Sequence, residues 1–268
     1  MKWGRVILVV FGALIVTALG IDAADTLQGK GGTLLSQVIS RDKGGPCPAG
    51  MTHVSNIPTV RCVDTYEASP SQNCPIVLPE NMISTQRNVE SRDCAAESKK
   101  GTIPWSFITR DQAMQMCARA GKRLPTSNEW YSVSLGLTDV EAACNVASRK
   151  IAPSGTHEHC VSAGGIYDLV GNVWEWVSDD VMNGVHGSTP LPESGYVAQV
   201  DAGGMATVSS EEPAALFGSD YFWSKKEGIY GVIRGGYYDS GKDAGLYTVH
   251  ADTVPTTASI GIGFRCII

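Results

Sequence analysis

The sequence predicts a mixed α+β domain that is rich in loops and stabilised by disulfides. Two helical segments, each opened by a capping box, lie near the middle of the chain. After them come short apolar segments separated by Gly, Pro and Ser, a pattern typical of irregular β structure. Thirty glycines and 13 prolines indicate many loops, and eight cysteines are an even number that can pair.

Residues 1–24 have the pattern of a targeting segment. Lys2 and Arg5 precede an uncharged, mostly apolar run from Val6 to Ile21. We expect either a signal peptide, cleaved after the small-x-small sequence Ala18-Leu-Gly20, or a short membrane anchor. Both alternatives place the remaining chain outside the cytoplasm, either anchored at the cell surface through this segment or secreted.

The Gly-rich stretch at residues 25–45 is expected to be a flexible tether. A single domain is then expected at residues 46–268. Its length and the 43% apolar fraction of the chain are sufficient to fill a core.

Each of the two expected helices has recognisable ends. Thr109-Arg-Asp-Gln112 is a capping box, and apolar residues recur at helical spacing until Gly121 ends the helix. Thr126-Ser-Asn-Glu129 is a second capping box, which opens a shorter helix carrying Trp130, Val133 and Leu137.

Charge and motif content exclude several functional classes. The net charge is −6, only 18% of residues are charged, and no basic run occurs, so nucleic acid is not an expected partner. A hydrolase would need a nucleophile beside a base, but the chain has no Gly-x-Ser-x-Gly elbow and its five histidines form no recognisable constellation. A Gly-x-x-x-x-Gly-Lys phosphate loop does not occur either.

Three motifs carry a resemblance to a known family. They are Cys117-Ala-Arg-Ala-Gly-Lys-Arg-Leu-Pro-Thr-Ser-Asn-Glu-Trp130, Asp168-Leu-Val-Gly-Asn-Val-Trp-Glu-Trp176, and Arg234-Gly-Gly-Tyr-Tyr-Asp-Ser240 read together with Gly261-Ile-Gly-Phe-Arg-Cys266. Over roughly residues 45–268 the chain resembles the sulfatase-modifying-factor family. The founding members of that family are formylglycine-generating enzymes, so the resemblance implies a C-type-lectin-like fold.

The resemblance also implies that the family's catalytic centre is lost. The two cysteines that bind Cu(I) in formylglycine-generating enzymes correspond to Ser240 and Gly245 here. Cu(I) selects sulfur ligands, which neither residue supplies. Cys266 is the only cysteine after Cys160, and it belongs to the structural ending of the chain. No copper is therefore expected. A related branch of the family uses a three-histidine iron site on an additional helical domain, for which this chain has no room.

The family resemblance implies one disulfide, Cys117 with Cys266. For the remaining cysteines, local spacing then suggests Cys47–Cys62, Cys74–Cys94 and Cys144–Cys160. A zinc site at His157-Glu-His159-Cys160 is a weaker alternative, because no Cys-x-x-Cys occurs and this segment has the composition of an exposed loop.

A structural calcium ion is also implied by the resemblance. Its ligands would be the side chains of Asp168 and Glu175 and the backbone carbonyls of Gly171 and Val173, a mixture that Ca²⁺ accepts. In the alternative interpretation, Asp168 caps a turn and Glu175 pairs with Arg234 or Lys122. Trp174 and Trp176 would then only pack.

The segment from Tyr237 to Ile262 is the candidate binding surface, because family framework residues bracket a run that mixes Tyr, Asp, Ser, His and Thr. It resembles the C-terminal variable region of proteins diversified by retroelements, which use the same scaffold. Tyr with small polar neighbours suits a binding surface. The alternative is an ordinary surface loop. The candidate ligand-binding residues are Tyr237, Tyr238, Asp239, Ser240, Asp243, His250, Asp252, Thr253, Thr257, Ser259, Ile260 and Gly261.

A long insert at residues 183–230 separates the tryptophan motif from the Arg-Gly-Gly turn. It exceeds the usual length of a connection, so we expect it to border the binding face, with Trp223 either on that face or in the core.

Together these features predict a non-catalytic, extracytoplasmic binding protein displayed at the membrane. Its partner would be a protein, peptide or glycan on another cell or surface. The alternatives are an oxidoreductase of the formylglycine-generating type that acts through another group, and a structural cell-envelope module.

Overall fold

The computed structural model describes residues 46–137 and 140–268. The chain divides into two compact units, Met1–Pro48 and Ala49–Ile268. The expected targeting segment at 1–24 and tether at 25–45 lie outside the described residues, and the expected domain start at residue 46 stays a prediction. No helix in the described part of the chain is long and apolar enough to cross a bilayer.

The second unit combines helices with short strands, which confirms the α+β class. The helices are α3 (Met82–Glu90), α4 (Arg110–Arg119), α5 (Ser127–Ser134) and α6 (Val140–Ala143). The strands are β1 (Met51–His53), β2 (Cys62–Asp64), β3 (Ala68–Pro70), β4 (Ala96–Ser98), β5 (Trp174–Met182), β6 (Val185–His186), β7 (Thr189–Pro190), β8 (Gly195–Val200), β9 (Ala206–Ser210), β10 (Tyr221–Ser224), β11 (Ile229–Arg234), β12 (Val249–Thr253) and β13 (Ile262–Phe264).

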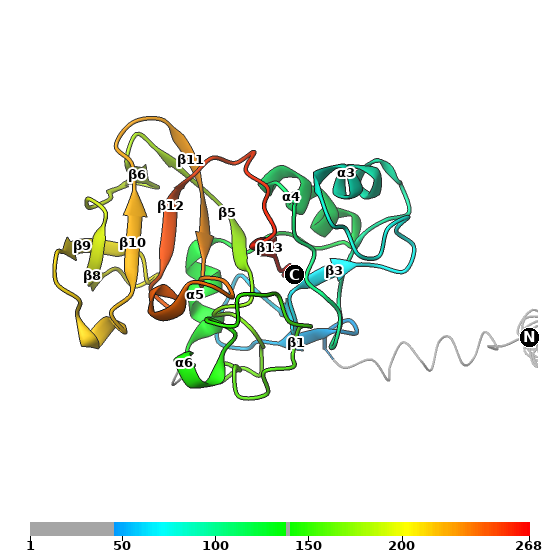
Figure 1. The fold of residues 1–268 in the computed structure, drawn as a ribbon, viewed down its shortest axis with the longest axis horizontal. Coiled ribbons are helices and arrows are strands. Elements are labelled where there is room, and N and C mark those ends of the chain that lie inside the picture. The colour runs from blue at the N-terminus through cyan, green and yellow to red at the C-terminus, as the bar shows by residue number, and fades with distance from the viewer. Residues whose placement is uncertain (1–45, 138–139) are drawn as a thin grey trace, which may run out of the picture. The chain divides into compact units, whose positions relative to one another are not determined.

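Nine strands form the main sheet, in the order β7-β6-β5-β11-β12-β10-β8-β9, with β13 parallel to β5 off this path. Figure 1 shows β8 and β9 at one end of this sheet, and α3 and α4 beyond β13 at the other end. Two further pairs, β1–β2 and β3–β4, are antiparallel. The sheet therefore joins the last 40 residues to segments that are far away in the sequence.

Both capping boxes form as the sequence predicts. The Thr109 hydroxyl accepts from the Gln112 N–H at the start of α4, and the Thr126 hydroxyl accepts from the Glu129 N–H at the start of α5. α4 is slightly shorter than expected, because Ala120 already caps it. The shorter α5 ends at Ser134, so Leu137 is buried just outside the helix rather than within it.

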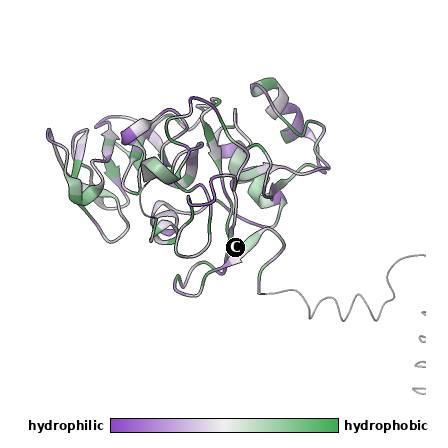
Figure 2. Cartoon of the chain, turned by 60° about the horizontal axis from the view of Figure 1, so that its bottom comes forward, coloured by the Kyte–Doolittle hydropathy of each residue, from purple (hydrophilic) through white to green (hydrophobic). Residues whose placement is uncertain are grey.

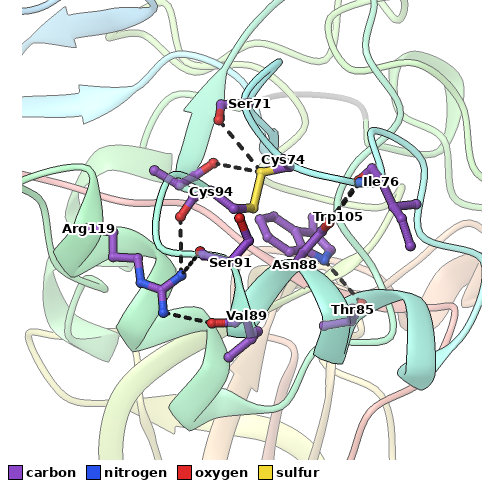
Figure 3. The surroundings of a disulfide bond; sticks show 11 residues. Ser71, Cys74, Ile76, Thr85, Asn88, Val89, Ser91, Cys94, Trp105 and Arg119 are labelled. Atoms are coloured by element: carbon purple, nitrogen blue, oxygen red, sulfur yellow. Dashed lines mark hydrogen bonds between the residues drawn. A yellow bond between two sulfur atoms is a disulfide. The ribbon is translucent and has the colours of Figure 1, made fainter.

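The helix α3 was not expected from the sequence. Asn81 caps it, because the Asn81 side chain accepts from the Ser84 N–H. The Arg119 guanidinium at the end of α4 donates to the carbonyls of Ser91 and Val89 and so joins the two helices next to the Cys74–Cys94 disulfide (Figure 3). The sequence pattern of α3 is only weakly helical, because polar residues dominate this helix and its apolar residues Met82 and Ile83 are exposed. Figure 2 shows hydrophobic and hydrophilic residues mixed along it.

Every cysteine of the sequence lies in the described residues, and none is free. Three pairs are those expected, namely Cys74–Cys94, Cys117–Cys266 and Cys144–Cys160. Cys47 and Cys62 are disulfide-bonded as well. Since Cys160 is paired with Cys144, its thiolate is not available to the alternative zinc site.

The long insert is folded into the sheet rather than left as a loop. Residues 183–230 contribute β6 to β10 and the start of β11. β10 runs parallel to β12, with Trp223 opposite His250, and β8 pairs with the other side of β10. The interpretation of this stretch as one long connection is therefore wrong, because short strands interrupted by Gly and Pro carry little periodic signal.

The core lies on both faces of the main sheet. Trp176 of β5 packs in a cluster with Met116 and Cys117 of α4, whereas Val177 and Val181 of the same strand pack in a second cluster that includes Trp130 of α5. β5 is therefore covered on both sides.

Candidate ligand-binding face

The Arg-Gly-Gly turn fixes the start of the candidate binding segment. Arg234, at the end of β11, is fully buried, and its guanidinium donates to the carbonyls of Gly204 and Leu246 and to the Ser127 hydroxyl. Gly235 then has a φ of 91°, and a Cβ at this position would lie 2.3 Å from the Leu169 carbonyl oxygen. Only glycine fits there, so the chain turns sharply and enters the surface segment at a defined place.

A groove of about 540 Å³ opens beside this segment. Eight of the twelve candidate ligand-binding residues line it, namely Tyr237, Tyr238, His250, Thr253, Thr257, Ser259, Ile260 and Gly261. Trp174, Ile233 and Ile262 complete the lining, although the sequence did not predict them as site residues. Trp174 comes from the tryptophan motif and reaches the groove because β5 pairs with β13, with Trp174 opposite Ile262. Only this tertiary register could have identified it.

The other four candidates do not line the groove. Asp252 is next to it, because its Oδ1 lies 2.9 Å from Nδ1 of His250. Burial by itself would raise the pKa of Asp252, but the hydrogen bond to His250 and the positive charges of His250 and Lys225 together outweigh burial, so the pKa is lowered. Ser240 accepts a hydrogen bond from the Tyr237 N–H at 3.0 Å and so has a role within the turn. Asp239 is exposed, and the carbonyl of Asp243 accepts from the Thr248 hydroxyl.

A row of aromatic rings leads away from the groove across the sheet. Trp223 stacks on His250 with ring centroids 4.0 Å apart, and Trp174 meets His250 edge to face. On the other side of Trp223 the row continues to Tyr221 and then to Tyr196. We call these five residues the aromatic row. Trp223 is half-buried and packs against one of the core clusters while it stacks on His250 of the candidate face, so the insert does border that face.

Gly245, one of the two positions for which the family resemblance implied a copper cysteine, lies against a buried carboxyl group. A Cβ at Gly245 would lie 2.0 Å from Oδ1 of Asp220, so the Asp220 carboxyl group occupies this space. Oδ2 of Asp220 accepts a hydrogen bond of 2.7 Å from the Tyr247 N–H. Burial raises the pKa of Asp220 to about 7. The side chain at this point is a carboxyl group of the insert, which does not bind Cu(I) as a thiolate does.

Buried carboxyl groups surround Arg265 behind the candidate face. Glu175 accepts from Arg265 at 2.5 to 2.9 Å and from the Trp130 indole N–H at 2.7 Å. The alternative partners proposed for Glu175 from the sequence were wrong, because Lys122 pairs with Asp64 and Arg234 binds backbone carbonyls. Trp176 is buried, as the same interpretation stated, but its N–H also donates to the Ile108 carbonyl, and Trp174 lines the groove.

The expected calcium ligands Asp168 and Glu175 lie among buried carboxyl groups. Asp168 accepts from the Gly155 N–H, and burial raises the pKa of Asp168 to about 6. Burial and the neighbouring Asp168 and Glu175 also raise the pKa of Glu67, a third buried carboxyl group that the sequence did not single out. Arg265 donates to both oxygens of Glu175. Calcium at Asp168, Gly171, Val173 and Glu175 stays a prediction.

No group of three or more His, Cys, Asp or Glu side chains within the described ranges is arranged to hold a metal ion. This finding concerns side-chain clusters, and the calcium hypothesis relies on backbone carbonyls for half of its ligands.

Comparison with known proteins identifies a family and several similar chains. Residues 131–268 match the model of the sulfatase-modifying factor enzyme 1-like domain. The formylglycine-generating enzyme of Mus musculus is 31% identical over 103 residues, which make up 28% of this chain and 27% of that enzyme. The chain therefore spans about a quarter of the length of this curated relative.

Solved structures that resemble the chain do so at low identity. The Major Tropism Determinant U1 variant has a TM-score of 0.45 and 17% identity, over 82% of this chain and 52% of its own. Treponema denticola variable protein 1 has a TM-score of 0.40 and 12% identity, over 84% and 92%. PvdO from Pseudomonas aeruginosa has a TM-score of 0.34 and 13% identity, over 81% and 89%.

Proposed function

The chain belongs to the sulfatase-modifying factor enzyme 1-like family, whose model matches more than half of its residues, and we propose that within this family it is a non-catalytic ligand-binding protein. Its ligand occupies the groove beside the segment from Tyr237 to Ile262. The observation that carries the proposal is the lining of this groove, to which eight residues predicted from the sequence contribute.

The chemistry of the cysteines supports a binding role over copper catalysis. All eight are in disulfides, so no thiolate remains for Cu(I). Ser240 stabilises the turn at Tyr237, and Gly245 lies directly beneath the Asp220 carboxyl group. Disulfides persist in oxidising compartments, so the proposal places the domain outside the cytoplasm. Its attachment to a membrane through residues 1–24 is part of the proposal.

Diversification of the binding segment by a retroelement is the second part of the proposal. Eight of the twelve candidate ligand-binding residues line one groove, whereas framework residues such as Arg234 and Arg265 are buried, an arrangement that suits variable contacts on a constant scaffold. Sequencing of the 3′ end of the gene and its flanks tests this. A near-identical copy that differs only at adenines, next to a reverse transcriptase gene, is expected; its absence would leave a groove of constant sequence.

The proposal is tested directly by a binding screen of the full chain on arrays of immobilised peptides and glycans. Ile260→Glu should abolish the interactions found, because Ile260 lines the groove. Val254→Glu is the matched control, since Val254 and Ile260 are both 49% exposed but Val254 does not line the groove. Equal binding by both variants would contradict the proposal and favour a structural module.

The alternative is an oxidoreductase of the formylglycine-generating type, which the similarity to the mouse enzyme favours. The full chain, incubated with Cu(I), oxygen and a synthetic peptide containing one cysteine, should leave that peptide unchanged in mass and take up no copper. Conversion of the cysteine to formylglycine would refute the binding-only proposal.

A further inference from the structure

Exposed apolar side chains gather just before α3 and in its first turn. Twelve large apolar side chains are exposed among the residues that the structure describes, and four of them lie within one short stretch, namely Val77, Leu78, Met82 and Ile83. The other eight are scattered over the rest of the chain. Single exposed apolar residues are normal on a protein surface, whereas a group of them marks an interaction surface. We call these four residues the α3 patch.

The α3 patch is held in a fixed shape by polar contacts and a disulfide. The buried Asn88 side chain donates to the Ile76 carbonyl at 2.7 Å and accepts from the Ile76 N–H at 2.9 Å (Figure 3). Asn81 caps the start of the helix, so the segment between Ile76 and Asn81 runs back along α3. The Cys74–Cys94 bond fixes the base of this segment. A surface that is already ordered loses little conformational entropy when it binds.

The domain core does not use the apolar residues of the patch. α3 faces the rest of the domain through Thr85, Asn88 and Val89, of which only Val89 is apolar. Met82 and Ile83 are 54% and 70% exposed on the same helix. The largest apolar side chains of α3 are therefore left to solvent, and covering them would supply the dominant favourable term of protein association.

Two charged side chains flank the patch in an arrangement that is complementary to itself. Glu80 and Arg87 are exposed, and neither forms an ion pair with another described residue. Arg87 follows Ile83 by four residues, which is about 6 Å along the helix axis. Glu80 lies at a similar distance from Ile83 in the opposite direction, just before the helix cap. A two-fold axis through Ile83 would therefore place Arg87 of each copy opposite Glu80 of the other.

We propose that the α3 patch is the two-fold interface of a homodimer. The four apolar side chains of one copy pack against those of the second copy, and Arg87 pairs with Glu80 across the interface in both directions. An apolar centre with a charged rim is the usual anatomy of a protein interface. A bilayer suits the patch less well, because it would bury the Glu80 carboxylate without a partner.

The dimer is a property of the scaffold and does not rest on the proposed function. Four apolar side chains per copy make a small interface, so the dimer should form reversibly. Association would join two candidate binding faces in one particle. Two linked faces bind a surface that carries many copies of a ligand more tightly than one face does, without any new contact in the groove.

The test is sedimentation-equilibrium ultracentrifugation of the full chain in a density-matched neutral detergent, which should show a monomer–dimer equilibrium. Ile83→Glu should weaken the association about tenfold or more, because it places two like charges at the two-fold axis. Ile229→Glu is the matched control and should dimerise as wild type does. Ile229 is 58% exposed, and it lies at the start of β11, outside the patch.

Charge-reversal variants test the two-fold geometry. Glu80→Arg and Arg87→Glu each bring like charges together, so each variant alone should dimerise more weakly than wild type. In a mixture of the two variants, each supplies the charge that the other lacks, and both ion pairs can form in the mixed dimer. The mixture should therefore associate more strongly than either variant alone. Both residues are exposed, and thermal unfolding of each variant confirms that it is folded.

Three results would overturn the inference: a full chain that is monomeric at every concentration, an Ile83→Glu variant that dimerises as wild type does, or a mixture no stronger than its components. A monomer that binds phosphatidylcholine vesicles, and loses this binding in Ile83→Glu, would assign the patch to a bilayer instead. None of these results concerns the groove, so they leave the proposed function intact. Failure of the proposed function would appear as equal ligand binding by the groove variant and its control.

Discussion

Removal of the Cys117–Cys266 disulfide should destabilise the domain more than removal of any other described disulfide. The bond joins α4 to the chain end, just after the binding segment, and encloses 149 residues. A disulfide lowers the entropy of the unfolded chain by an amount that grows with the logarithm of the enclosed loop. For this loop the stabilisation is about 5 kcal/mol at 25 °C. The Cys144–Cys160 bond encloses only 16 residues and is worth about 3 kcal/mol by the same relation.

The comparison of two double variants, C117A/C266A and C144A/C160A, tests this difference. All four cysteines are buried, so the loss of sulfur packing is similar in both variants and largely cancels. Equilibrium urea unfolding of the full chain, followed by tryptophan fluorescence, gives the two free energies. With a slope of about 2.5 kcal/mol/M for a domain of this size, the midpoint of C117A/C266A should lie about 0.8 M below that of C144A/C160A. Equal midpoints, or the opposite order, would refute the argument from loop length.

Three further predictions concern the candidate face and the buried carboxyl groups. The variant S240C/G245C should bind no Cu(I) and unfold at lower temperature than S240C, because the new Cβ at 245 meets Asp220; copper binding measured with a Cu(I) chromophore would contradict this. Asp220 has a pKa of about 7 in the folded protein and about 3.9 when unfolded, so its contribution to stability is complete below pH 4 and is lost as the pH rises through 7. Urea unfolding of wild type should therefore show a decline over this range, at most about 4 kcal/mol, that Asp220→Asn lacks; parallel curves would disprove the raised pKa. If calcium binds at Asp168, EDTA should lower the melting temperature of wild type but not of Asp168→Asn, whereas equal responses would remove the calcium hypothesis.

The starts of helices could be predicted from the sequence because the hydrogen bonds that form them join residues close together in the chain. A capping box needs only residues three positions apart, so Thr109 and Thr126 identified the starts of two helices. The family and its C-type-lectin-like fold followed from motifs, and the match over residues 131–268 confirms them. The motifs also led to the Cys117–Cys266 pair, which no spacing rule identifies across 149 residues.

The arrangement of the candidate face was decided by the tertiary structure. His250 was a candidate from its position in the C-terminal segment, but its stacking on Trp223 depends on the parallel pairing of β10 with β12. Asp220 and Gly245 lie 25 residues apart in the sequence and meet only because the insert joins the same sheet.

The sequence by itself determined the family, the helix starts and the candidate binding segment, because turn glycines, helix caps and disulfides act over short distances or through recognisable motifs. The tertiary structure alone decided which partners those residues meet. Arg265 rather than Arg234 neutralises Glu175, and Trp174 reaches the groove, because the register of β5 with β11 and β13 sets those contacts. Strand pairing is long-range, and a shift of one residue would turn every side chain of β5 to the opposite face.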